Sequence, residues 1–441
     1  MSIKLRLAPI LLVTLASFFN LNLHGQDAPT FRGNLPHSGV YDAAGVPNFG
    51  GLKWKFHTGG MLIGSPAVVG GTVYFGSDDG NFYAVDAESG VQKWKFEARS
   101  RIPSTPAVAG GIVYFGVYSG SFLALDAATG AVKWKFKTGG EKRFAGKHLH
   151  GVQPIEETMP DPFDCYLSSP VVWNGAVYFG SGDGNIYSLN AASGAVNWKF
   201  KTGNVVHASP AIADGVLFLG SWDTNFYALD AATGAEKWRF KTGEDADIHN
   251  QEGIQSSAAV VDGMVYFGCR DSHLYALDAK TGEKKWAFSG NGSWVVSSPA
   301  VRDGKVYFVT SDTSLLEELD AKTGTVLHSA SFNHWYLYSS PALAGGTLYV
   351  GLTQGKLAAV DLATFKPSWS FETDGMKEHG AGYTKPDGTP NEEAIYRSDF
   401  YDDMVSGVDR VMSMGAILSS PVVVGNTVYV GSADGNLYAL R

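Results

Sequence analysis

The stretch "GSPAVVGGTVYFGSDDGNFYAVDAESGVQKWKF", residues 64–96, decides the fold of this chain. Its short β-branched and aromatic runs are separated by Gly-Gly and Asp-Gly pairs, which are strong signals of tight hairpin turns. The unit therefore predicts four short antiparallel strands, here named A to D in chain order. In the turn between strands C and D, the Asp86 carboxylate can accept downstream N–H groups while Gly90 supplies a positive φ.

Copies of this unit continue to the end of the chain. Without an insertion the closing tryptophan of strand D recurs every 40 residues, from Trp54 to Trp94 and again to Trp134, a period typical of a four-stranded propeller blade. In the sixth unit His328 takes the place of this tryptophan. The start of strand A recurs eight times, at Pro66, Pro106, Pro170, Pro210, Ala258, Pro299, Pro341 and Pro421. We therefore expect an all-β fold, an eight-bladed β-propeller with four-stranded antiparallel blades.

The two ends of the chain complement each other. Residues 419–441 supply strands A, B and C of the eighth unit, and the missing strand D is found as "LKWKF" at residues 52–56. We expect this N-terminal strand to complete the last blade and close the ring. A single blade cannot bury both faces of its sheet, so neighbouring blades must stack, with the tryptophan of strand D as the wedge between them.

Residues 1–25 differ in kind from the rest. Lys4 and Arg6 precede an apolar stretch from Leu7 to Phe19, as in a secretory signal peptide. The stretch is short for a membrane span, although an uncleaved anchor is an alternative. No cysteine lies near the cleavage region, so we expect a periplasmic or secreted protein that is neither a lipoprotein nor integral to the membrane. A lead-in, residues 26–51, connects this segment to the propeller at residues 52–441.

Composition narrows the class of partner. The 441 residues carry a formal net charge of −9 without a basic run, which argues against nucleic acid because phosphate binding needs clustered Lys and Arg. The two cysteines, Cys165 and Cys269, could pair in an oxidising compartment or remain separate thiols. We expect a monomer.

The repeat is interrupted on one face. In an antiparallel meander, the B to C turns and the D to A crossings share a face, and the long insertions at residues 137–166, 241–255 and 372–417 are all D to A crossings. Residues 400–415 carry apolar side chains at near-helical intervals and predict a short helix over the mouth of the ring. We call this the decorated face.

Substitutions in the repeat collect on the decorated face as well. Aromatic and hydrogen-bonding side chains replace small or aliphatic ones in the B to C turns and at the starts of strand A, and such groups at the mouth of a ring indicate a binding pocket. The alternative is that large side chains plug the wide axis of an eight-bladed ring. The candidate ligand-binding residues are Tyr118, His207, Trp222, His249, Asn250, Gln255, Arg270, Trp294, Trp335 and Tyr336.

The first insertion also contains a candidate metal site. His148 and His150 would face the same way on a strand and could bind a transition metal, with Glu157 or Asp164 as the carboxylate. No third ligand follows at a diagnostic spacing, so a solvated loop is the alternative. We find neither a nucleophile elbow nor a glycine-rich phosphate loop, since the glycines of the repeat belong to hairpin turns.

The consensus "SSPVVxxGxVYxGSxDGxLYALDAxTGxxxWxF" resembles the pyrroloquinoline quinone (PQQ)-type propeller repeat over residues 52–441. That family includes quinoprotein dehydrogenases and BamB, an outer-membrane assembly lipoprotein. The lead-in "FRGNLPHSGVYDAAGVPNFGGLKWKF", residues 31–56, resembles the start of stand-alone, BamB-like bacterial propellers.

The resemblance implies two competing functions. A quinoprotein dehydrogenase of alcohols or sugars would stack PQQ on Trp222, Trp294 or Trp335, pair it with Arg270, and hold calcium with Glu157, Asp164 or Asn250. The adjacent cysteine pair and the haem-binding motif of many such enzymes are missing from the sequence. A BamB-like protein would instead bind a protein, peptide or glycan at the cell envelope without a cofactor. We favour the second interpretation, a non-catalytic scaffold that binds through its decorated face.

Overall fold

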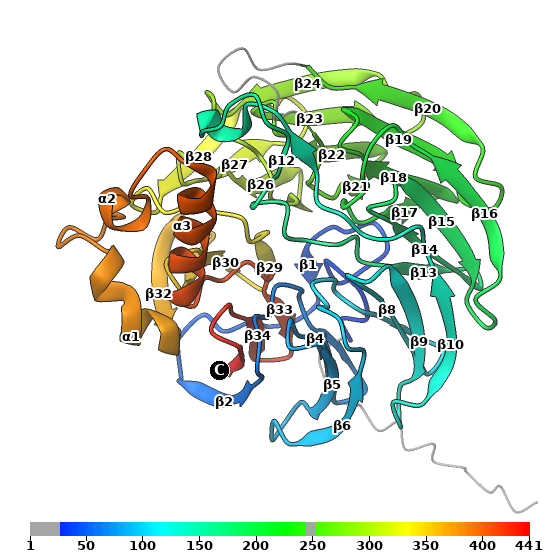
Figure 1. The fold of residues 1–441 in the computed structure, drawn as a ribbon, viewed down its shortest axis with the longest axis horizontal. Helices are drawn as coiled ribbons and strands as arrows, with labels where there is room; N and C mark the ends of the chain where they lie inside the picture. Colours follow the sequence, from blue (N-terminus) through cyan, green and yellow to red (C-terminus); the bar gives the residue numbers. More distant parts are fainter. Residues whose placement is uncertain (1–26, 244–252) are drawn as a thin grey trace, which may run out of the picture.

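The computed structural model describes residues 27–243 and 253–441. Within them, eight four-stranded antiparallel sheets stand around one axis, as Figure 1 shows, so the predicted eight-bladed β-propeller is confirmed. The predicted signal peptide, residues 1–25, and the candidate residues His249 and Asn250 lie outside the described part of the chain.

The strands of each blade run from A near the axis to D at the rim. Blade 1 consists of β3 (Ala67–Val69), β4 (Thr72–Gly76), β5 (Asn81–Asp86) and β6 (Gln92–Glu97). Blade 2 consists of β7 (Ala107–Ala109), β8 (Ile112–Val117), β9 (Ser121–Asp126) and β10 (Val132–Lys137). Blade 3 consists of β13 (Val171–Trp173), β14 (Ala176–Gly180), β15 (Asn185–Asn190) and β16 (Val196–Lys201). Blade 4 consists of β17 (Ala211–Ala213), β18 (Val216–Gly220), β19 (Asn225–Asp230) and β20 (Glu236–Lys241). Blade 5 consists of β21 (Ala259–Val261), β22 (Met264–Gly268), β23 (His273–Asp278) and β24 (Lys284–Ser289). Blade 6 consists of β25 (Ala300–Arg302), β26 (Lys305–Val309), β27 (Leu315–Asp320) and β28 (Val326–Ser331). Blade 7 is β29 (Ala342–Ala344), β30 (Thr347–Leu352), β31 (Lys356–Asp361), β32 (Lys366–Glu372), with β1 (Val40–Tyr41) added in parallel to β29.

The eighth blade is built from both ends of the chain. It joins β33 (Val422–Val424), β34 (Thr427–Gly431) and β35 (Asn436–Leu440) to β2 (Leu52–His57), which pairs antiparallel with β35. The predicted closure is therefore confirmed. No turn joins strands C and D of this blade, and the lead-in takes the place of that turn. The Val46 carbonyl accepts the indole N–H of Trp369, the strand D tryptophan of blade 7, at 2.8 Å, and Phe49 stacks on the same indole.

The tryptophan of strand D locks each blade to the next. The Trp94 indole N–H, for example, donates to the Ala127 carbonyl of the following blade at 3.0 Å. A Cβ on Gly130, which has a φ of +74°, would lie 2.7 Å from the Trp94 ring, so the turn glycine is required for both backbone conformation and space. The same bond recurs from Trp54, Trp134, Trp198, Trp238 and Trp286 to Ala87, Ala191, Ala231, Ala279 and Ala321.

One blade junction replaces both members of this contact. His328 stands in the tryptophan position of blade 6, and Phe365 stands in the glycine position of blade 7 with a φ of +54°. The two rings stack with centroids 5.3 Å apart. A smaller wedge therefore faces a larger turn residue, so the space between the blades stays filled.

Eight hydroxyl groups form a closed ring around the axis. In each blade, the Ser or Thr hydroxyl at the start of strand A accepts the backbone N–H of the equivalent residue in the preceding blade, at 2.8–3.3 Å. The last link runs from the Ser420 N–H to the Ser65 hydroxyl, so the ring closes on itself. Its members, here called the hydroxyl ring, are Ser65, Thr105, Ser169, Ser209, Ser257, Ser298, Ser340 and Ser420.

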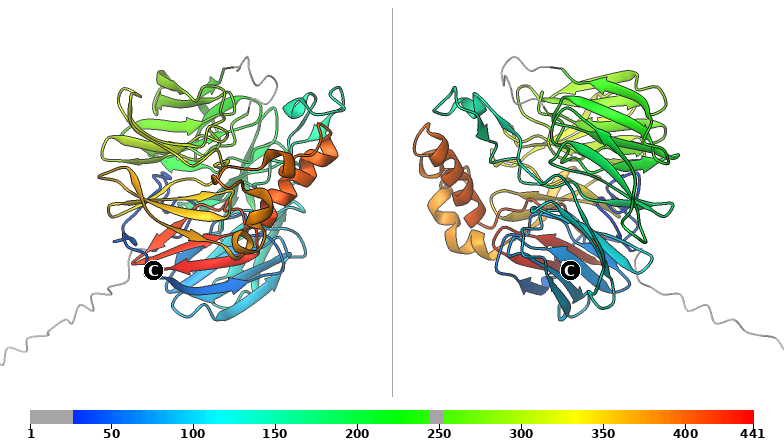
Figure 2. Two further views of the ribbon diagram at one scale, coloured as in Figure 1. Left: turned by 90° about the vertical axis from the view of Figure 1, so that its left-hand side faces the viewer. Right: turned by 45° about the vertical axis from the view of Figure 1, so that its right-hand side comes forward.

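The lead-in follows the ring on the face opposite the decorated one. Figure 2 shows this segment, in dark blue, on the side away from the helices. Backbone groups or a hydroxyl of the lead-in bond to every blade in order, at or beside strand A. The pairs are Ala28 with Val68, Pro29 with Val108, Thr30 with Pro170, Leu35 with Ile212, Pro36 with Val260, Ser38 with Val301, Gly39 with Leu343 and Gly45 with Gly425.

The first and last insertions project from the decorated face, as predicted (Figure 2). The first contains a hairpin of β11 (Ala145–Gly146) and β12 (Met159–Pro160) around a short turn, η1 (Leu149–Gly151). The last contains α1 (Asp374–Tyr383), α2 (Glu392–Ile395) and α3 (Tyr401–Ser413), and α3 confirms the helix predicted within residues 400–415. None of the helices in the described residues has the length and apolar character needed to span a membrane.

Candidate functional site

Arg270 lies fully buried under the decorated face. Its guanidinium carbon is 4.4 Å from the ring centre of Trp222 and 4.2 Å from that of Trp294. Its Nη1 donates to the Asp161 carboxylate, while Gln255 Oε1 accepts from Nε at 3.1 Å and Nη2 at 2.8 Å. Four candidate ligand-binding residues therefore converge, as predicted for the mouth of the ring, but they converge on one another and on Asp161.

Asp161 belongs to the first insertion and is as fully buried as Arg270. Burial alone would raise the pKa of Asp161, but the attraction of Arg270 and the contact with His150 outweigh it, so that the pKa lies well below its usual range. The pair is ionised, and its two buried charges neutralise each other. The insertion thus supplies a carboxylate of its own to the cation at the mouth of the ring.

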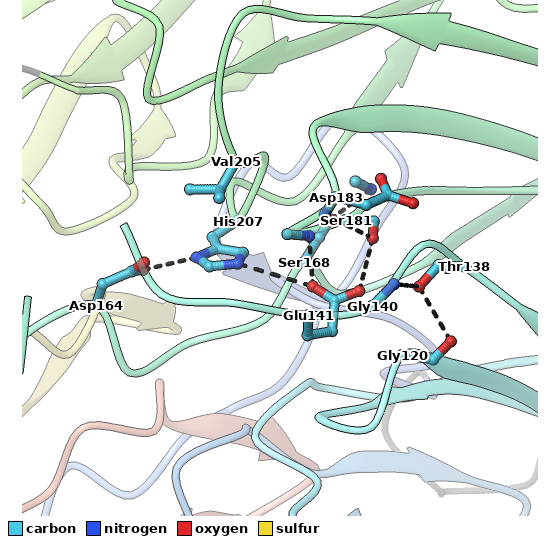
Figure 3. Close-up of polar contacts among 12 residues, drawn as sticks. Gly120, Thr138, Gly140, Glu141, Asp164, Ser168, Ser181, Asp183, Val205 and His207 are labelled. Carbon is cyan, nitrogen blue, oxygen red and sulfur yellow. Dashed lines mark hydrogen bonds and ion pairs between the residues drawn. The ribbon is translucent and has the colours of Figure 1, made fainter. Parts of the chain in front are cut away.

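His207 forms a second anchor for the same insertion (Figure 3). Its Nδ1 lies 2.7 Å from Asp164 Oδ1 and its Nε2 lies 3.8 Å from Glu141 Oε2, whose carboxylate also accepts the Ser181 hydroxyl at 2.7 Å. Burial would lower the pKa of His207, but the two carboxylates raise it to about 10. At neutral pH a buried imidazolium therefore holds both ends of the first insertion against blade 4.

The candidate aromatic residues are covered by other side chains. Phe144 of the first insertion stacks on Trp222, with ring centres 4.5 Å apart. Trp335 is fully buried beneath the last insertion and donates its indole N–H to the Gly388 carbonyl at 2.8 Å. Tyr336 lines a cavity of only about 20 Å³ between the insertions. These side chains fill the mouth of the ring and support the insertions that cover it.

The metal ligands predicted from the first insertion do not converge. His148 and His150 lie at the turn η1 with φ values of +58° and +52°, so the expectation that they share one face of a strand is wrong. His148 faces Glu156 at 3.5 Å, His150 faces Asp161 at 3.4 Å, and Asp164 binds His207. Glu157 is exposed. Within residues 27–243 and 253–441, no three His, Cys, Asp or Glu side chains form a metal cluster.

The two cysteines are free thiols in this structure. Cys269 is fully buried and its thiol donates to the Gly253 carbonyl at 3.5 Å, while Cys165 lies in the first insertion near Tyr336 and Tyr396. The sequence left open whether the two cysteines pair, and in the structure they are separate thiols.

An open groove of about 730 Å³ lies beside the covered mouth. We call it the basic groove. Tyr118 and Arg101 of blade 2 form one wall, Lys142 and Arg143 of the first insertion form another, and Tyr401 at the start of α3 forms a third. Its other lining residues are Glu141, Ala145, Pro160, Asp402 and Val405. Tyr118 is thus the one candidate ligand-binding residue that the described structure places in an open hollow.

The cationic side chains of the basic groove differ in their exposure and in their partners. Arg101 lies 5.7 Å from the Tyr118 ring centre and forms an ion pair with Asp78 at 2.6 Å. Lys142 is exposed, and within the described part of the chain its side chain forms no ion pair. Arg143 is half-buried and interacts electrostatically with Asp78 and Tyr401. Two cations of the first insertion, of which Lys142 is the more exposed, therefore line an open groove in a protein whose net charge is −9.

A family model described as outer membrane protein assembly factor BamB matches residues 42–155, 166–289 and 247–441. The chain belongs to this family. No curated protein sequence matches it.

Solved structures share the propeller fold of this family member at low identity. BamB from Moraxella catarrhalis is 18% identical with a TM-score of 0.63, covering 89% of this chain and 97% of that one. A europium-containing methanol dehydrogenase is 16% identical with a TM-score of 0.66, covering 95% and 98%. A quinohemoprotein alcohol dehydrogenase from Comamonas testosteroni is 15% identical with a TM-score of 0.67, covering 94% and 80%. At these identities the likeness extends to the fold alone.

The residues at the mouth of the ring do not fit a bound PQQ. A flat quinone stacked on Trp222 or paired with Arg270 would need the positions that Phe144 and Asp161 occupy. The chamber on the axis below them has a volume of about 40 Å³, whereas ligand pockets usually measure about 300–1,000 Å³. Of the side chains that the resemblance assigned to the cofactor, Trp222, Arg270 and Asp164 take part in holding the first insertion.

Sequence reasoning missed most of the residues that distinguish this face. Asp161, Glu141, Lys142 and Arg143 all lie in the first insertion, whose length was the only signal available. An insertion without periodicity does not indicate which of its acids will fold inward and which of its cations will stay in solvent.

Proposed function

We propose that this protein is an extracytoplasmic, non-catalytic binding protein of the cell envelope that captures an acidic segment of a protein partner in the basic groove. The observation that carries the proposal is the contrast between the two hollows of the decorated face. The mouth of the ring is filled by the chain itself, whereas the basic groove is open and presents the exposed Lys142 and the half-buried Arg143 between Tyr118 and Tyr401.

The chemistry of the groove favours carboxylates. Guanidinium and ammonium groups bind carboxylates through charge-assisted hydrogen bonds, and aromatic side chains beside them supply contact area at low entropic cost. Asp402 is the only exposed acid among the lining residues, because the Glu141 carboxylate is bound to Ser181 and the Gly182 N–H. The walls come from a rigid blade and two anchored insertions, so little ordering is needed on binding.

The direct test is fluorescence anisotropy with a labelled peptide of alternating glutamate and leucine. The charge reversals Lys142→Glu and Arg143→Glu together should weaken binding about tenfold or more, since each rim charge contributes up to about 1 kcal/mol. The matched control reverses Lys322, exposed in a C to D turn on the opposite face, and Lys366, exposed at the start of β32 beside the next such turn. Equal binding of a lysine-leucine peptide, or an equal loss in the control variant, would contradict the proposal.

The same preparation tests the alternative, a PQQ-dependent oxidoreductase. Titration with PQQ and calcium should produce no saturable quenching of tryptophan fluorescence and no dye-linked alcohol oxidation, because Trp222 and Arg270 are already engaged. Saturable quenching together with turnover would replace the binding protein by the enzyme.

A further inference from the structure

The hydroxyl ring surrounds a small chamber on the propeller axis. The chamber has a volume of about 40 Å³, and all eight members of the ring line it. Phe31 of the lead-in lies at one end, while Tyr166, His207, Gln255 and Tyr338 line the end toward the decorated face. This space is enough for about two or three water molecules or one small ion, and too small for an organic ligand.

The wall of the chamber is rich in hydrogen-bond donors. Each ring hydroxyl already accepts a backbone N–H from the preceding blade, so its own proton is left to donate. Among the described residues, no ring hydroxyl donates to a protein acceptor. The lining contains no carboxylate either, because Asp164 and Glu141 are turned toward His207 and the first insertion. Converging O–H groups that donate to no protein acceptor favour an anion.

A buried cation of the lead-in lies near the hydroxyl ring, outside the set of residues that line the chamber. Arg32 follows Phe31, is 1% exposed, and donates from Nη2 to the Pro299 carbonyl at 3.1 Å. Pro299 directly follows Ser298 of the hydroxyl ring, so the guanidinium lies at the lead-in side of the ring. Burial lowers the pKa of Arg32 to about 10, which leaves it charged at neutral pH.

Arg32 has no counter-ion in the described part of the chain. Its Nε and Nη1 are buried without a partner, as are both ring nitrogens of His37 and the hydroxyl of Tyr41. His37 is uncharged at neutral pH, since burial and the nearby Arg32 lower its pKa to about 3. An isolated buried charge costs several kcal/mol unless an opposite charge compensates it. The hydroxyl ring and Arg32 are thus two independent features that call for the same kind of ligand.

We propose that the axial chamber binds one small monovalent inorganic anion of halide size, held by the hydroxyl ring and neutralised by Arg32. The anion would join the inner ends of the eight blades to the lead-in, because the ring belongs to the blades and Arg32 to the lead-in. This site lies on the axis, apart from the basic groove, and does not depend on the function proposed above.

Crystals of the full chain grown in sodium bromide provide the first test. Bromide is the probe because its anomalous scattering separates it from water. We expect an anomalous peak inside the hydroxyl ring. A well-ordered chamber with water density and no anomalous peak would overturn the proposal.

Thermal unfolding provides the second test, at constant ionic strength in sodium bromide and in sodium gluconate, whose anion is too large for the chamber. The midpoint should rise by about 3 °C in bromide at a hundredfold excess over Kd. Arg32→Gln should abolish the difference between the two salts, whereas Arg397→Gln, which removes an exposed charge, should keep it.

A variant of the ring itself keeps the proposal testable if Arg32→Gln fails to fold. Thr105→Val preserves the shape of the side chain and removes one hydroxyl, so it should weaken the bromide response of the midpoint. An unchanged response in Thr105→Val and in Arg32→Gln would show that the salt effect arises elsewhere.

Discussion

At the scale of single residues, the blades are joined by a pair of matched positions. An indole in one blade requires a glycine in the next, because a Cβ at Gly130 would meet the Trp94 ring at 2.7 Å. His328 and Phe365 reverse the sizes of the two partners and still fill the space. We therefore expect the two positions to be energetically coupled, although they lie 37 residues apart in the sequence (365 minus 328).

This coupling can be measured in a double-mutant cycle. His328→Trp alone should destabilise the protein, since Phe365 occupies the space of the indole, and Phe365→Gly alone should leave a gap beside the imidazole. The double variant restores the repeat pair, so its loss of stability should be smaller than the sum by about 0.5–3 kcal/mol. Urea unfolding gives the free energies.

A pair from two separate junctions serves as the control for this cycle. Trp94→His combined with Phe365→Gly should be additive within about 0.5 kcal/mol, because the sites share no partner. Additive effects of His328→Trp and Phe365→Gly would mean that the stacking of these two rings contributes nothing specific.

At the scale of elements, the first insertion covers the mouth of the ring and is anchored there by buried charged groups. Asp161 binds Arg270, and Glu141 and Asp164 bind His207 from the two ends of the same segment. Removing one partner of such a buried pair leaves the other charge uncompensated, which is far more costly than losing a surface ion pair. These contacts also fix the position of Lys142 and Arg143, and so they shape the basic groove.

The His207 anchor should make stability depend on alkaline pH. The pKa of His207 is about 10 in the folded protein and 6.5 for an ordinary histidine. A raised pKa contributes stability that is complete below the unfolded value and is lost as pH rises toward the folded value. The destabilisation caused by His207→Gln, measured by urea unfolding, should therefore be large at pH 6 and shrink steadily toward pH 10.

His379→Gln provides the control for this titration, because His379 lies half-exposed on α1. Its effect should be small and constant over the same pH range. If the effect of His207→Gln were equally constant, the charge of the imidazolium would not contribute to holding the insertion.

At the scale of the whole molecule, the N-terminal part of the chain closes the ring twice. β2 completes the sheet of blade 8, and the lead-in bonds to all eight blades on the opposite face. Since each blade buries its faces only against its neighbours, an open ring would expose two sheet faces at once. We expect strand pairing by β2 and bonding by the lead-in to contribute separately to the stability of the closed ring.

Two truncations distinguish these contributions. A chain starting at Gly51 loses the lead-in but keeps β2, and should unfold cooperatively at a lower temperature. A chain starting at Thr58 also loses Trp54 and Phe56, whose removal from the packed blade junctions costs about 3–5 kcal/mol each, and should lose its single cooperative transition. Calorimetry gives both results, and equal behaviour of the two chains would show that β2 does not close the ring.

The sequence by itself determined the architecture of this protein. The number of blades, their strands, the closure by residues 52–56 and the face of the insertions all follow from the spacing of tryptophans, turn glycines and prolines, because a repeat encodes contacts that are local or occur once per blade. The gathering of Trp222, Gln255, Arg270 and Trp294 could also be predicted, since equivalent positions of a ring point to the same axis.

Only the tertiary structure decided what these residues contact. Asp164 was a candidate metal ligand and proved to be the partner of His207, while Asp161, which the sequence did not distinguish from its neighbours, bound Arg270. The reason is physical: a non-repeating insertion takes the path on which its charges find partners and its apolar side chains are buried, and neither condition leaves a period in the sequence. The same holds for Arg32, whose isolation becomes visible only when the lead-in is seen beneath the hydroxyl ring.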